Sequence, residues 1–152
     1  MKTPQFPLFE VSQNQWYCNI VNAPHELSNW TILAVIKFVP DSSVYFDSNN
    51  NQWIIKNLSI TRELNWIDGL LANTIYNPII PVQIIWSHKG KYELNELKKA
   101  LIDCVETDDD ILTQFVDNEF LIKKIKDCTE FNNLLDVFER YVINFDENSI
   151  ER

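Results

Sequence analysis

A chain of 152 residues can fold as one domain with a buried core, and a hydrophobic fraction of 45% with five tryptophans argues against a disordered protein. The formal net charge is −9, of which residues 89–152 carry −7, with 16 acidic and 9 basic side chains. This acidic half repels phosphate backbones, so we expect no nucleic-acid partner. It favours a basic protein partner instead.

The first part of the chain has the composition of strands. Aromatic and β-branched residues gather in short segments, and turn-forming residues separate them. Residues 30–39 have the strongest strand pattern, and the turn at 40–43 ends it. Short connections predict an antiparallel meander. The expected strands are residues 16–21, 30–39, 44–46 and 52–58.

After residue 60, the apolar residues recur at the spacing of a helix. Thr61 is expected to cap a helix, which ends before Pro78 because the residue before a proline avoids the helical region. Residues 79–86 read again as a strand, which lies at an edge or starts after Pro81. A strand, a helix and a strand in this order predict one parallel crossover. The face shared by the apolar residues of this helix contains Leu64, Ile67, Leu70 and Leu71.

The remainder of the chain is expected to be helical. Apolar residues recur at helical spacing from residue 92 to about 106, at 108–115, at 119–127 after a cap at Asn118, and from a cap at Thr129 to about Val142. Strands followed by helices predict a single α+β domain over residues 1–152, with an N-terminal, mostly antiparallel sheet and a C-terminal group of helices. Residues 1–10 and 146–152 are expected to be poorly ordered.

The sequence shows no targeting segment and no membrane span. Residues 1–10 lack the apolar stretch of a secretory signal, and no apolar run is long enough to cross a bilayer. We therefore expect a cytoplasmic protein without a membrane partner. Three cysteines in no zinc-binding spacing are expected to be reduced and largely buried, with no metal and no cofactor. They are Cys18, Cys104 and Cys128.

A small hydrolase is an alternative interpretation. A cysteine paired with His25 or His88 could supply a nucleophile and a base, and paired carboxylates could supply acid–base catalysis. No local pattern marks either arrangement. A calcium site in the acidic run is disfavoured, because Ile111 and Leu112 occupy positions that need oxygen ligands. A structural adaptor subunit is a third alternative.

Acidic side chains concentrate in residues 106–119. They could contact lysines and arginines of a partner, or they could cap helices at a solvated junction. The tryptophans could likewise pack in the core or anchor an interface with a partner. Tyr92 stands at a loop–helix junction and is expected to be exposed. The candidate partner-binding residues are Tyr92, Glu106, Asp108, Asp109, Asp110, Asp117 and Glu119.

Residues 108–115 (DDDILTQF), followed by Asn118-Glu119-Phe120-Leu121, resemble bacterial immunity proteins of polymorphic toxin and contact-dependent growth inhibition systems. The length, the acidity and the absence of catalytic motifs are also similar to those proteins, and the resemblance covers the C-terminal third to half of the chain. It implies a small cytosolic inhibitor that binds and blocks its own toxin domain. Many such toxins are nucleases with basic clefts, which an acidic inhibitor would suit.

Overall fold

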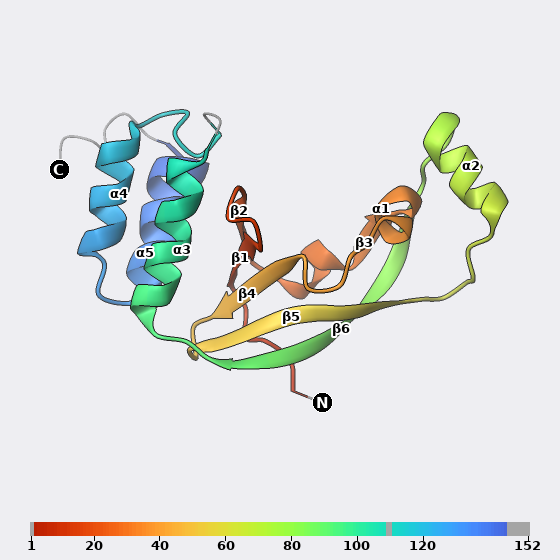
Figure 1. Cartoon of the computed structure of the whole chain (residues 1–152), viewed down its shortest axis with the longest axis horizontal. Coiled ribbons are helices and arrows are strands. Elements are labelled where there is room, and N and C mark those ends of the chain that lie inside the picture. The colour runs from red at the N-terminus through yellow and green to blue at the C-terminus, as the bar shows by residue number, and fades with distance from the viewer. Residues whose placement is uncertain (1, 109–110, 146–152) are drawn as a thin grey trace.

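In the computed structural model, which describes residues 2–108 and 111–145, six antiparallel strands form one curled sheet in the order β2-β1-β4-β5-β6-β3. Three helices cover one face of this sheet, and two others stand at its far end (Figure 1). The strands are β1 (Leu8–Ser12), β2 (Cys18–Val21), β3 (Asn29–Thr31), β4 (Ser43–Asp47), β5 (Asn51–Ile60) and β6 (Ile79–Lys91). The helices are α1 (Ile32–Ile36), α2 (Trp66–Thr74), α3 (Leu94–Glu106), α4 (Asn118–Asp127) and α5 (Phe131–Phe138), with a 3-10 turn η1 (Pro24–Leu27) and a π-helical turn η2 (Glu139–Ile143). The α+β class with a sheet before a helical group is confirmed.

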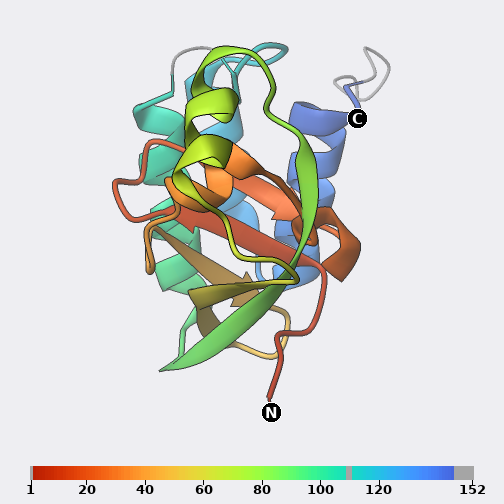
Figure 2. The ribbon, with the colours of Figure 1, turned by 90° about the vertical axis from the view of Figure 1, so that its right-hand side faces the viewer.

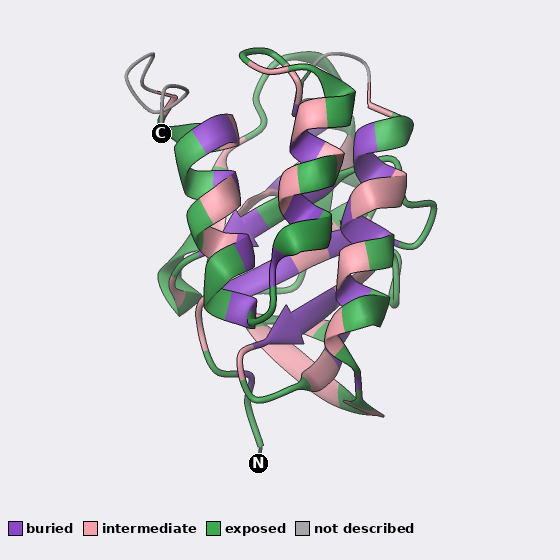
Figure 3. Ribbon diagram, turned by 90° about the vertical axis from the view of Figure 1, so that its left-hand side faces the viewer, coloured by how far each residue is buried: buried purple, intermediate pink, exposed green. Residues whose placement is uncertain are grey.

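The larger core lies between the sheet and the layer of α3, α4 and α5 (Figure 3). Phe9 of β1 is at its centre, and its ring meets those of Phe131 and Phe138 edge-on at centroid distances of 5.4 Å. The predicted helical spacing of residues 92–106 is confirmed, because the apolar positions of α3 point into this core. Its fully buried side chains include Phe9, Leu97, Leu101, Cys104, Leu121, Ile125 and Leu134.

The curl of the sheet encloses a second, smaller core on the opposite face. Its buried residues are Leu8, Val21, Tyr45, Trp53 and Ile55. Partly buried aromatic rings from β3, β6 and the segment after α1 cover them, with the ring centroids of Tyr45 and Trp86 5.1 Å apart. β5 buries three consecutive residues, 53–55, and of these Trp53 and Ile55 point into this smaller core.

The two cores also overturn, for residues 8–10, the expectation that the first ten residues are poorly ordered. Residues 8–10 belong to β1, which pairs with β2 on one side and β4 on the other. Leu8 and Phe9 are neighbours in sequence, so they point to opposite faces of the sheet, and each is completely buried in a different core. The prediction for residues 146–152 lies outside the described residues.

The strand predicted for residues 30–39 is wrong beyond Thr31. The chain forms the three residues of β3 and then turns into α1. Thr31 caps this helix by accepting a hydrogen bond from the Ala34 N–H at 3.2 Å, and the first free N–H groups find acceptors in the segment before β6. The Ile32 N–H donates to the Pro78 carbonyl at 3.0 Å. These acceptors outweigh the β propensity of the sequence.

The simple meander and the parallel crossover are also wrong. β3 follows β2 in the chain but lies at the opposite edge of the sheet, next to β6. β5 and β6 are antiparallel, so α2 belongs to a long connection between two hairpin strands. A sequence period reveals the type of an element but not the direction in which the chain returns to a sheet.

Some predicted helix limits change because different side chains act as caps. α2 starts at a capping box made by Asn65, not at Thr61. The short helix predicted for 108–115 is wrong in its described part, where residues 111–115 form turns and bends. Asp108 accepts hydrogen bonds from the Leu112 and Thr113 N–H groups, which replaces a helical ladder with a side-chain-stabilised turn. Asp117 and Glu130 stand at the N-cap positions expected for Asn118 and Thr129.

Candidate protein-binding surface

The helices α1 and α2 project from the sheet at the end opposite the helical layer (Figure 1, Figure 2). The helix α2 lies in the connection between the long strands β5 and β6, and α1 follows β3, which pairs with the first residues of β6. We call residues 32–39 and 61–79 the apolar arm.

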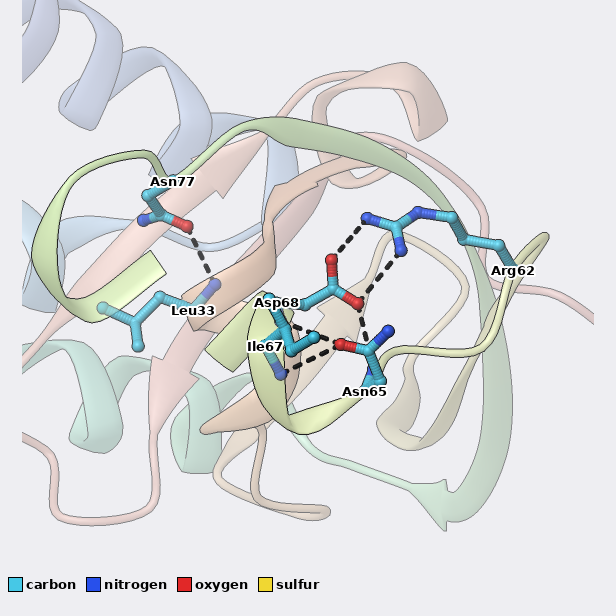
Figure 4. Close-up of polar contacts among 6 residues, drawn as sticks. All are labelled: Leu33, Arg62, Asn65, Ile67, Asp68 and Asn77. Carbon is cyan, nitrogen blue, oxygen red and sulfur yellow. Dashed lines mark hydrogen bonds and ion pairs between the residues drawn. The ribbon is translucent and has the colours of Figure 1, made fainter. Parts of the chain in front are cut away.

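The arm is held together by polar contacts at its base (Figure 4). The Asn65 side chain accepts hydrogen bonds from the Ile67 and Asp68 N–H groups at 2.9 and 3.1 Å. The guanidinium of Arg62 donates two hydrogen bonds to the Asp68 carboxylate, at 3.1 and 3.0 Å. These Arg62 hydrogen bonds and the Asn65 N–H lower the pKa of the Asp68 carboxyl. The carboxylate therefore stays ionised and paired at neutral pH.

α1 and α2 pack directly against each other. The Leu33 N–H donates to the side-chain oxygen of Asn77 at 2.9 Å, which ties the segment after α2 to the start of α1 (Figure 4). Gly69 faces Ile36, and a Cβ atom at Gly69 would lie 3.5 Å from the Ile36 Cδ1 atom. The arm is therefore a small packed unit that presents one joint surface.

The outer surface of the arm is strongly apolar. Trp66 is 76% exposed and Ile75 84%, whereas Ala72 is the one buried residue of α2. A helix with apolar residues on nearly all sides is normally covered on more than one side. The exposed large apolar side chains of the arm are Ile36, Val39, Trp66, Ile67, Leu70, Leu71, Ile75, Tyr76 and Ile79.

Charged residues are scarce in and around α2. Asp68 is the only Asp, Glu, Lys or Arg between Glu63 and Lys89 in the sequence, and Arg62 neutralises it. This pair is the one salt bridge within residues 2–108 and 111–145. An exposed apolar surface with few charges on a protein with a net charge of −9 is typical of a site that another macromolecule covers.

The acidic candidate residues lie at the opposite end of the molecule, where α3 leads into α4 (Figure 1). Glu106 and Glu119 are exposed. Asp108 and Asp117 serve the local backbone, and Asp117 caps α4 by accepting the Phe120 N–H at 2.7 Å. The structure thus brings these four residues to one end, but the carboxylate of Asp108 stabilises a turn and that of Asp117 caps a helix. Asp109 and Asp110 lie outside the described residues.

The prediction that Tyr92 is exposed is wrong. Its side chain is 4% exposed, its ring meets that of Phe46 edge-on, and its hydroxyl donates a hydrogen bond to the Asp47 carbonyl at 2.7 Å. The junction between β6 and α3 crosses the edge of the larger core, so the aromatic ring turns inward. Burial, and secondarily the charge of Asp47, raise the pKa of the Tyr92 hydroxyl above its ordinary value near 10.

Replacing Tyr92 with phenylalanine should lower the free energy of unfolding at pH 7 by about 1 kcal/mol, because the buried Asp47 carbonyl loses its donor. A raised pKa favours the neutral hydroxyl in the folded state. This contribution is therefore complete below pH 10 and is lost as the pH rises above 10 through the folded-state pKa. Urea unfolding at pH 7 and pH 11 should show the difference between the two proteins shrinking at high pH. Tyr76→Phe, at an exposed position, is the control at pH 7; an equal loss in both variants would contradict the prediction.

The structure does not pair a cysteine with a histidine. Cys18, Cys104 and Cys128 are buried in the larger core, and a hydrogen bond to Cys104, together with burial, raises the pKa of the Cys18 thiol. His25 is exposed in η1, and His88 contacts the Asn51 side chain at 3.1 Å. These positions separate the groups that thiol catalysis would need side by side.

The importance of α2 is missed by sequence reasoning, which treats its apolar residues as one buried face. A signal was present, because residues 64–88 combine many large apolar residues with a single charged one.

Comparison of the chain with protein-family models, with curated proteins and with solved structures gives no match. Across residues 2–108 and 111–145, no helix has the length and apolar character that crossing a membrane requires.

Proposed function

We propose that this protein is a non-catalytic inhibitor that binds another protein through its apolar arm, and that it acts in the cytoplasm as the immunity protein of a bacterial toxin domain. The observation that carries the proposal is the exposure of nine large apolar side chains on one packed unit, whose helix α2 has a single charged residue, Asp68, paired with Arg62. Such a surface gains free energy when a partner removes it from water.

The arm has the residue types that dominate protein interfaces. Trp66 and Tyr76 are large and rigid, and tryptophan and tyrosine are enriched among the residues that contribute most to binding. Exposed apolar residues of α1 and α2 lie on the same arm, and such neighbours help to exclude water from the central contacts of an interface. We expect the matching surface of the toxin domain to be apolar and uncharged where it meets α2.

The acidic end of the chain has a separate role in this proposal. Residues 89–152 carry a net charge of −7, and a basic toxin domain would be attracted to them over distances of several ångströms before contact. Long-range attraction raises the association rate without requiring that Glu106 or Glu119 touch the partner. The similarity of the segment around residue 108 to immunity proteins supports the same assignment.

Co-expression with the neighbouring gene product tests the function. The C-terminal region encoded immediately upstream is produced in a host cell with and without this protein, and growth is followed. We expect growth arrest without this protein and recovery with it. An upstream product that is harmless, or that is toxic in both cases, would contradict the immunity function.

A further inference from the structure

A cavity of about 550 Å³ lies beside the turn between β4 and β5. This turn is at the opposite end of β5 and β6 from the arm (Figure 1). Its lining includes Lys2, Lys91, His88 and amide side chains around the carboxylate of Asp47. This volume is within the range of sites for small molecules. The cavity shares no residue with the apolar arm.

Asp47 organises the floor of this cavity. Its side chain is 1% exposed, and one carboxylate oxygen accepts the N–H groups of Asn49 and Asn51, both at 2.9 Å. The other oxygen accepts the indole N–H of Trp53 at 2.8 Å. The Asn51 amide nitrogen donates to both oxygens at 3.1 Å. Donors of the protein itself therefore satisfy both carboxylate oxygens and hold the side chain in one position.

The same contacts orient His88. Because the amide nitrogen of Asn51 faces Asp47, its amide oxygen faces the Nε2 atom of His88, 3.1 Å away. An oxygen accepts there, so Nε2 carries the hydrogen and donates it. The His88 ring also lies against the Trp53 ring, with a centroid distance of 4.9 Å. The chain from Asp47 through Asn51 thus holds the imidazole in one orientation.

A β-bulge brings Lys91 to the same side as His88. Residues three apart in a regular strand point to opposite faces. Here Trp53 pairs with His88 and Gln52 with Gly90, so Lys89 is an extra residue in β6. Gly90 has a φ of 142°, in a region that favours glycine. The extra residue shifts the alternation of side chains by one position, so His88 and Lys91 point to the same face of the sheet. Both side chains line the cavity.

From this geometry we propose that the cavity binds a small oxyanion, a phosphate or a carboxylate, between the ammonium groups of Lys2 and Lys91. The Lys91 Nζ atom donates one hydrogen bond to the Asn49 carbonyl at 2.9 Å, and its two other hydrogens are free for a ligand. The cavity lining contains these two lysines and a single carboxylate, that of Asp47, so it has a local excess of positive charge on an acidic protein. This assignment is independent of the proposed function.

Titration followed by NMR tests the site in the full-length protein. The indole N–H signal of Trp53 reports on the floor of the cavity, because this group donates to Asp47. Sodium phosphate and sodium acetate are added in separate arms, with sodium chloride at equal ionic strength as the reference. We expect a saturable shift with phosphate, with acetate or with both, and the two arms distinguish the ligand classes. A shift that does not saturate, or that equals the chloride response, would overturn the proposal.

Two variants complete the experiment. Lys91→Gln should weaken binding about tenfold or more, the usual loss for a hydrogen bond between charged groups. Lys89→Gln removes the same charge from the bulge of the same strand but does not line the cavity, so its affinity should stay within about twofold of the original, as for a surface charge. Spectra of both variants must retain the dispersion of the folded protein. Equal affinities in the two variants would assign the effect to net charge and overturn the site.

Discussion

Replacing Trp66 with alanine is expected to weaken the complex with the toxin domain by about 2–4 kcal/mol, or roughly 30- to 700-fold in Kd. The side chain is 76% exposed, so its removal should change the free energy of unfolding by less than about 0.5 kcal/mol. The loss should appear mainly in the dissociation rate, because the contact forms after the encounter. Surface plasmon resonance with immobilised toxin domain measures both rates, and urea unfolding measures stability.

Trp16→Ala is the matched control for this variant. Trp16 is 62% exposed, and it lies in the turn between β1 and β2, close to the end of α3. There the Thr107 hydroxyl donates to the Gln15 carbonyl. The control should bind the toxin domain like the original protein. If Trp16→Ala weakens binding and Trp66→Ala does not, the interface is at the acidic end and the apolar arm is not the binding surface.

Replacing Asp47 with alanine should cause the largest loss of stability, about 3–5 kcal/mol in the free energy of unfolding. The change removes the acceptor for the backbone N–H groups of Asn49 and Asn51 and for the indole of Trp53, and these groups are buried or partly buried. Unpaired buried donors cost more than a lost hydrogen bond is worth. Chemical denaturation with urea, fitted to a two-state transition, gives the value.

Two further substitutions separate hydrogen bonding from charge. Asp136→Ala removes a carboxylate from an exposed position of α5 and should cost less than about 0.5 kcal/mol. Asp47→Asn keeps the shape but directs an amide N–H toward other donors, so we expect an intermediate loss. A similar small effect of Asp47→Ala and Asp136→Ala would show that the network around Asp47 contributes little to folding.

The elements that sequence reasoning predicted well are those with a strong local period. α3 and α4 have one apolar face each, and β4 and β5 are β-branched and aromatic segments on either side of a turn. The strand prediction for residues 30–39 was wrong because the acceptors that stabilise α1 come from Asn77 and Pro78, more than 40 positions away. Periodicity carries no information about such partners.

The candidate site also has features that the sequence reveals and features that only the packing decides. The sequence reveals the acidity of residues 89–152, but not that Asp108 and Asp117 are occupied by backbone N–H groups. It marks Tyr92 as an aromatic residue at a junction, and only the packing against Phe46 shows that the ring is buried. Its apolar α2 residues are compatible with a core helix, and only the position of α2 at the tip of β5 and β6 leaves them exposed.

The sequence by itself therefore determined the α+β class, the order of sheet and helices, and the charge of the chain. These properties depend on residue type and short-range spacing, which one sequence contains. Tertiary structure alone decided which apolar residues meet in a core, which remain on the arm, and which polar groups gather around Asp47. Those outcomes depend on contacts between residues far apart in the chain, whose free energies no local pattern encodes.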